Sequence, residues 1–115
     1  MGTIRNRMTI VHGWEYEKIR EVRNNAISSF QTLFGNDYDV EKYMVSQLLE
    51  SPINGEFSFV IMGDCSKNGW DKSEELKEFR MKWAKSQLKY VQNIVIVDLG
   101  EGDDSFLEDV HDELY

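Results

Sequence analysis

The sequence has one cysteine, one proline and no long hydrophobic run, and these shortages exclude several classes of protein. Cys65 cannot form a disulfide within the chain, which fits a reducing compartment. No apolar run approaches the ~20 residues that span a bilayer, and the run near the N-terminus is too short for a signal peptide. We therefore expect a cytoplasmic protein with no membrane-spanning segment.

Basic residues are also missing from the C-terminal segment, residues 98–115. This segment carries eight acidic side chains, equal in number to the whole net charge of −8. Direct nucleic-acid binding is disfavoured there, because phosphates would meet like charge, whereas a basic protein surface would be attracted. The residues that we expect to bind a basic protein partner are Asp103, Asp104, Asp109, Asp112 and Glu113. The alternative is a solvated acidic face that only keeps the protein soluble.

The chain is nevertheless rich enough in apolar residues to build a core. It has 115 residues, of which 41% are hydrophobic and 12% aromatic, a size and composition typical of one domain. No repeat or low-complexity segment divides it, so we expect a single domain over residues 1–115. Met8 could be an alternative start, which would leave residues 1–7 as a disordered leader.

Hydrophobic periodicity predicts an alternation of strands and helices. Short runs rich in β-branched and aromatic residues predict three strands, over 8–12, 57–62 and 93–99, and the first of them could start as early as Thr3. The second of these is apolar enough to be buried on both faces. Apolar side chains at helical spacing predict helices over 14–34, from 37 or 39 to about 50, and over 72–90. Ser105 with Glu108 forms a capping box, which predicts a last short helix beginning there.

The predicted order, β-α-α-β-α-β-α, favours a mixed α/β (α+β) domain with a small three-stranded mixed sheet and about four helices. A strand, a helix and a strand in series usually form a right-handed parallel unit. Strands 57–62 and 93–99 are therefore expected to be parallel neighbours, with strand 8–12 antiparallel to them.

The stretch "IMGDCSKNGWDKS", residues 61–73, raises the question of a reactive loop. It lacks the glycine spacing of a phosphate-binding loop and the GxSxG pattern of a nucleophile elbow. Cys65 would need a histidine base, but His12 and His111 are distant in the sequence. We therefore interpret the stretch as a structural turn that leads into a helix.

A metal site is the alternative that the aspartates leave open. If strands 57–62 and 93–99 are parallel neighbours, Asp64 and Asp98 lie at adjacent carboxyl ends, where open α/β sheets bind ligands. Asp103 could join them from the following loop. Carboxylate oxygens suit Mg²⁺ or Mn²⁺, so this alternative predicts a metal-dependent enzyme acting on phosphate esters.

The segments "DCSKNGWDKS", "WAKSQ" and "IVIVDLGEGDD" resemble a group of small uncharacterised bacteriophage and prophage proteins that carry a D-G-S-K-x-G-W-type loop. The resemblance covers roughly residues 54–104, and Cys65 stands where that group has glycine. It implies a phage origin and work inside a bacterial host, and it transfers no catalytic residue. Together with the charge pattern, it favours a non-enzymatic module that binds a host or phage protein and needs no cofactor. The sequence leaves a homo-oligomer open.

Overall fold

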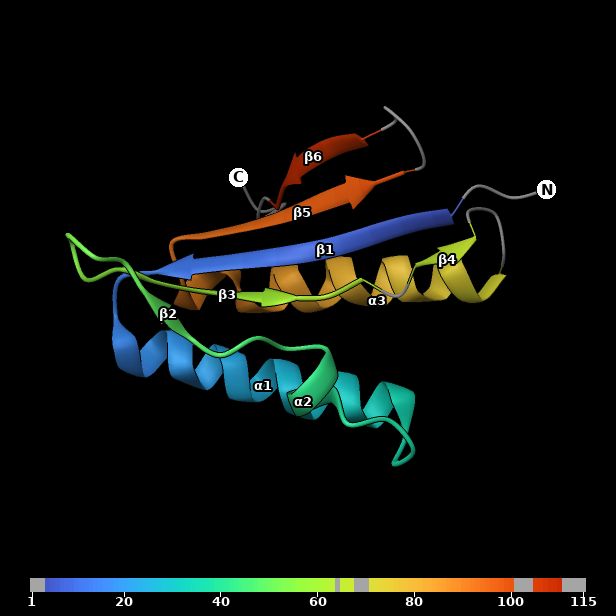
Figure 1. Cartoon of the computed structure of the whole chain (residues 1–115), viewed down its shortest axis with the longest axis horizontal. Helices are drawn as coiled ribbons and strands as arrows, with labels where there is room; N and C mark the ends of the chain where they lie inside the picture. The colour runs from blue at the N-terminus through green and yellow to red at the C-terminus, as the bar shows by residue number, and fades with distance from the viewer. Residues whose placement is uncertain (1–3, 64, 68–70, 101–104, 111–115) are drawn as a thin grey trace.

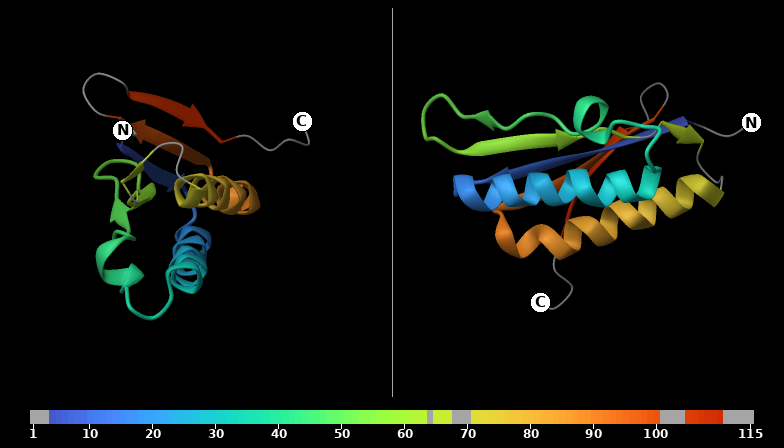
Figure 2. Two further views of the ribbon diagram at one scale, coloured as in Figure 1. Left: turned by 90° about the vertical axis from the view of Figure 1, so that its right-hand side faces the viewer. Right: turned by 90° about the horizontal axis from the view of Figure 1, so that it is seen from below.

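One sheet and two long helices packed on one of its faces make up the fold (Figures 1 and 2). The computed structural model describes residues 4–63, 65–67, 71–100 and 105–110. Views at right angles place α1 and α3 on the same side of the sheet. The protein is therefore a two-layer α+β fold, which confirms the predicted mixed class.

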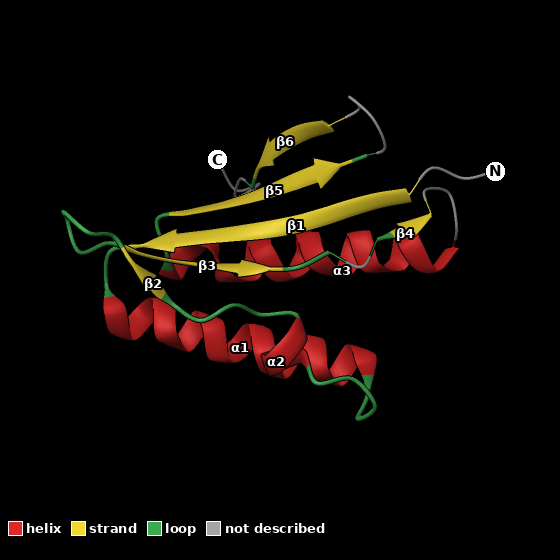
Figure 3. Ribbon diagram, in the orientation of Figure 1, coloured by secondary structure: helices red, strands yellow, loops and turns green. Residues whose placement is uncertain are grey.

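The sheet is antiparallel, with the spatial order β2-β3-β1-β5-β6 (Figure 3). Its central strand pairs on one side through Val11 with Phe59 and on the other through Val11 with Ile94. The strands are β1 Ile4–Gly13, β2 Leu49–Glu50, β3 Phe57–Ile61, β4 Ser66–Lys67, β5 Asn93–Leu99 and β6 Ser105–Asp109.

The long helices bury the apolar stripes that their sequences predict. On α1 the buried side chains are Ile19, Val22, Ala26 and Phe30, and the helix ends at Gly35, whose φ of +79° suits glycine. On α3 they include Leu76, Trp83 and Ala84. The helices are α1 Tyr16–Phe34, α2 Val40–Tyr43 and α3 Asp71–Gln87, which continues as a 3-10 turn over Leu88–Tyr90.

Aromatic packing joins the two helices beneath the sheet. The ring of Phe30 lies 5.1 Å from that of Phe79 and 5.9 Å from that of Trp83, in edge-on arrangements. The indole nitrogen of the buried Trp83 donates to Asn25 Oδ1 at 2.9 Å. The core therefore lies between α1, α3 and the inward face of β1, β3 and β5.

The strand order corrects one prediction and confirms another. β3 and β5 run in the same direction, but β1 lies between them and is antiparallel to both, so they are not neighbours. The antiparallel first strand was predicted; the adjacency was wrong. The elements β1, α1, β2, β3, α3 and β5 follow the β-α-β-β-α-β order of the split β-α-β motif, and β6 is added at one edge.

Three local predictions are also wrong. Residues 105–109 form strand β6 rather than the start of a helix. The second helix covers only α2, capped by Asp39 as predicted, because Val45 instead forms a bridge with Ile61. Residues 4–7 belong to β1, so the part of the proposed leader that the structure describes is ordered.

Strand β4 continues β3 along the same side of β1 after one extra residue. Thr9 pairs with Ile61 and Arg5 with Ser66, so β1 advances four residues while its neighbour advances five. Cys65 lies between these two pairings and adopts the left-handed conformation, with φ +54°. The described part of the loop that begins at residue 61 therefore takes part in strand pairing with β1. Residues 64 and 68–70 lie outside the description.

Candidate functional site

Three arginines lie between the sheet and α3, and each is more than nine-tenths buried. Arg5 and Arg7 of β1 are 5% exposed, and Arg80 of α3 is 3% exposed. Alternation along β1 places Arg5 and Arg7 on the same inward face as Thr9 and Val11. Guanidinium groups at this depth require partners that offset their lost hydration.

Asp98 supplies a carboxylate to two of these arginines. Arg5 Nε lies 3.1 Å from Asp98 Oδ1, and Arg7 Nε lies 3.5 Å from Asp98 Oδ2. Asp98 is in phase with the buried Ile94 and Ile96 on β5, and its side chain is 14% exposed. The ion pairs therefore join the two neighbouring strands β1 and β5 inside the molecule.

Arg80 donates hydrogen bonds to neutral groups of the sheet. Its guanidinium donates to Thr9 Oγ1 at 2.8 Å, to the carbonyl of Ile61 at 3.3 Å and to the carbonyl of Met62 at 2.8 Å. The same group lies 5.4 Å from the centre of the Phe30 ring, in a cation–π contact. One side chain of α3 thus joins the helix to both β1 and β3.

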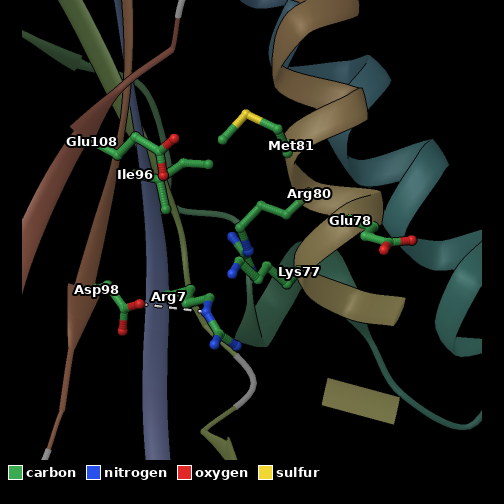
Figure 4. Close-up of a pocket in the computed structure, with 8 residues that line it drawn as sticks. All are labelled: Arg7, Lys77, Glu78, Arg80, Met81, Ile96, Asp98 and Glu108. Carbon is green, nitrogen blue, oxygen red and sulfur yellow. Dashed lines mark ion pairs between the residues drawn. The ribbon is translucent and has the colours of Figure 1, made fainter. Parts of the chain in front are cut away.

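A pocket of about 300 Å³ opens beside these arginines, between α3 and the β5–β6 side of the sheet (Figure 4). Ile96 and Met81 supply apolar lining. Arg7, Lys77 and Arg80 bring positive charge, whereas Asp98 and Glu108 bring negative charge from the strands. Glu78, which also lines the pocket, points away from the sheet in the close-up. Such a lining can hold polar groups of either sign, but it offers no nucleophile next to a base.

The predicted metal ligands are only partly described. Asp98 sits at the end of β5 as expected, but its oxygens face Arg5 and Arg7. Asp64 and Asp103 lie outside the described residues. Within the described part of the chain, no group of three His, Cys, Asp or Glu side chains is placed to hold a metal ion. The Mg²⁺ or Mn²⁺ site remains a prediction.

The acidic segment forms an edge of the sheet where the structure describes it. Asp109 is exposed on β6, as is its neighbour Glu108. Asp103, Asp104, Asp112 and Glu113 lie outside the described residues. Asp98 forms ion pairs with the buried Arg5 and Arg7, so it is not part of the acidic surface. The exposed acidic residues of this segment follow Asp98 in the sequence.

Cys65 and His12 lie at opposite ends of β1. Cys65 is an exposed free thiol next to the Arg5 pairing, whereas His12 pairs near the other end, with Ser58. About seven strand residues, or roughly 20 Å, separate these positions. His12 instead contacts Glu56 Oε2 at 3.3 Å and Ser58 Oγ at 3.0 Å. This separation supports the interpretation of the loop as a turn.

No protein-family model, no curated protein and no solved structure matches this chain. Among the helices that the structure describes, none is long and apolar enough to cross a bilayer. The function must therefore be argued from the arrangement of the chain's own residues.

Sequence reasoning did not find the arginine cluster. The alternative start at Met8 would have placed Arg5 and Arg7 in a leader, and no role was predicted for Arg80. The alternation along the first strand did contain a sign of the cluster, because Arg5 and Arg7 fall on the same face as Thr9 and Val11. On β5, Asp98 falls on the same face as Ile94 and Ile96, so it is placed to pair with those arginines.

Proposed function

We propose that this protein is a non-enzymatic binding module that engages a basic protein partner through its acidic C-terminal segment. The observation that carries the proposal is that residues 105–109 of this segment form an edge strand of the sheet, with Glu108 and Asp109 exposed. Among the described residues, β6 pairs only with β5.

An edge strand favours one mode of recognition. Its outer backbone N–H and C=O groups are available to a further strand, and peptides often bind by adding to such an edge. Acidic side chains along β6 would select an extended segment that carries lysine or arginine, and would repel an acidic one. The backbone supplies affinity in this arrangement, and the charges supply orientation and selectivity.

The resemblance to phage-encoded proteins suggests where the partner would be found. A phage protein works in the cytoplasm of a bacterial cell, so a host or phage protein with a basic, strand-forming segment is the partner that we expect. The internal Asp98 belongs to the fold in this proposal and takes no part in the contact.

The proposal can be tested with the full chain as bait in bacterial lysate. We expect it to retain a basic protein that raised salt releases, because exposed charges are screened. The double variant Glu108→Lys, Asp109→Lys should lose that protein. The matched control is Glu17→Lys, Glu21→Lys, which makes the same change of charge on the exposed surface of α1. Retention of every interaction by the β6 variant would contradict the proposal.

A further inference from the structure

The face of the sheet opposite the helices is unusually apolar. Alternation along the strands directs Met8 and Ile10 of β1, Val60 of β3, and Val95 and Val97 of β5 away from α1 and α3. Figures 1 and 2 show both helices on the other side of the sheet. No described element covers this open face.

The register places these side chains in two adjacent rows across the strands. One row runs Val60, Ile10, Val95 and ends at Asp109. The next runs Met8, Val97, Leu107. Exposure rises toward the rim, from 37% for Ile10 on the central strand to 62% for Leu107 on the edge strand. The apolar side chains thus form one continuous patch.

The row at one end of this patch is polar. It contains Ser58, His12 and Asn93, which pair in register across β3, β1 and β5. At the other end the polar Asn6 pairs with the apolar Leu99, which is 39% exposed. An apolar centre bordered by polar residues is the pattern of a protein–protein contact.

Charge is largely absent from this face, although 30% of the chain is charged. Among the described side chains on the rows, only Asp109, on the edge strand, carries a full charge. Lys42 lines a pocket with Val60 and Met62 at the β3 border of this face, whereas the rows named above hold no lysine or arginine that could contact nucleic acid or anionic lipid. A neutral, apolar partner surface is the match, and a second copy of this chain presents one.

The strand sequences also fit two covered faces. Antiparallel sheets with one solvated face normally alternate apolar and polar residues. Here "FVIM" of residues 59–62 and "IVIV" of residues 94–97 are continuously apolar. The helices cover one of the two faces, so the pattern calls for a second layer.

We propose that two copies of this chain associate through the open face, with their sheets stacked about a twofold axis. Four strands about 4.8 Å apart, contributing about seven residues on average, give a face of roughly 450 Å² per copy. Two copies would bury about 900 Å² in total, an area typical of weak, transient complexes, so we expect a Kd in the micromolar range. The dimer uses the open face of the sheet, whereas the basic partner proposed above would add to the outer backbone edge of β6, and Asp109 lies at the border between the two.

Mass measurement by sedimentation or light scattering tests this directly. The wild-type chain should rise from the 13.5 kDa of one copy toward twice that mass between about 1 and 200 μM. Ile10→Lys places a charge at the centre of the contact and should weaken association by at least about tenfold. The matched control Ile53→Lys, at a turn residue that is 87% exposed and off this face, should associate like wild type.

Leu107→Lys supplies a second variant at an exposed edge position, in case a charge at Ile10 prevents folding; circular dichroism identifies that case. Leu107→Lys should also weaken association. A wild-type mass of one copy throughout the range, or undiminished association of the folded Leu107→Lys variant, would overturn the proposal. Salt separates it from the acidic-edge proposal, because screening strengthens contact between two chains of charge −8 and weakens contact with a basic partner.

Discussion

Arg80 on α3 donates a hydrogen bond to Thr9 Oγ1 on β1 at 2.8 Å, across 71 positions of the chain. The same guanidinium reaches the carbonyls of Ile61 and Met62. A single buried side chain therefore fixes where the helix sits over the two strands that run beside each other at the middle of the sheet.

Replacing Arg80 should cost more stability than its position on a helix suggests. Arg80→Ala removes the hydrogen bonds to Thr9, Ile61 and Met62 and the contact with Phe30, so we expect the free energy of unfolding in urea to fall by about 3 kcal/mol. Arg80→Lys keeps the charge without the planar fork and should recover less than half of the loss. The exposed Lys82 on the same helix is the control, and Lys82→Ala should stay within about 0.5 kcal/mol of wild type. Equal effects at the two positions would contradict this role.

Asp98 should behave as a structural residue. Asp98→Asn preserves the shape of the side chain but removes the negative charge beside Arg5 and Arg7. We therefore expect the free energy of unfolding, measured in urea, to fall by about 2–3 kcal/mol. The matched control Asp109→Asn, on the exposed edge strand, should change the same measurement by less than about 0.5 kcal/mol. A tolerant Asp98 would mean that the two ion pairs contribute little.

Gly63 should not tolerate a side chain. A Cβ there would lie 2.7 Å from the backbone nitrogen of Arg7 and would also overlap Asn6 Oδ1. The backbone of the central strand cannot move aside without breaking its pairing, so Gly63→Ala should destabilise the protein by at least about 2 kcal/mol in thermal or urea unfolding. Gly13→Ala meets only ordinary contacts of 3.5 Å or more and is the control, with an expected change below about 1 kcal/mol. Similar losses at both glycines would show that the close approach of Gly63 is not the cause.

Divalent metal provides a fourth measurement. Because two guanidinium groups face the oxygens of Asp98, we expect millimolar Mg²⁺ or Mn²⁺ to leave the melting temperature unchanged. A ligand that binds only the folded state must raise it. A rise that Asp98→Asn abolishes would establish the metal alternative and displace our view of this carboxylate.

The long elements follow from the sequence because their periodicity is strong. On α1, Ile19, Val22, Ala26 and Phe30 repeat at helical spacing, and all four are buried. On β5, the run after Asn93 alternates between the helix-covered face and the open face. The local sequence pattern is sufficient to predict a helix or strand where burial of one helix stripe or one strand face determines that element.

The sheet order was beyond reach because periodicity does not name pairing partners. The chain from β3 through α3 to β5 obeys the expected common direction, yet a third strand lies between them. Handedness rules govern direction and crossover, and they allow such an insertion. Asp64 and Asp98 were predicted to be close because strands 57–62 and 93–99 were predicted to be neighbours. Nothing in the local sequence indicated that another strand lies between them.

The C-terminal strand was mistaken for a helix because its residues fit both periods. Leu107 and Val110 are three apart, and Ser105 with Glu108 resembles a capping box. A helix of this length is marginal alone in water. Five register pairs with β5 stabilise the extended form instead. The backbone nitrogen of Val110 donates to the carbonyl of Ile94 at 3.0 Å, and the Val110 side chain is buried.

The central place of β1 has a consequence for how this protein is made. β1 is synthesised before both of its neighbours, which are completed only at Ile61 and Leu99. Both edges of the strand stay open until those neighbours follow, and such unpaired edges favour aggregation during synthesis. Arg5 and Arg7 keep the first half of the strand charged until Asp98 has been made, so their ion pairs form only after β5 is complete.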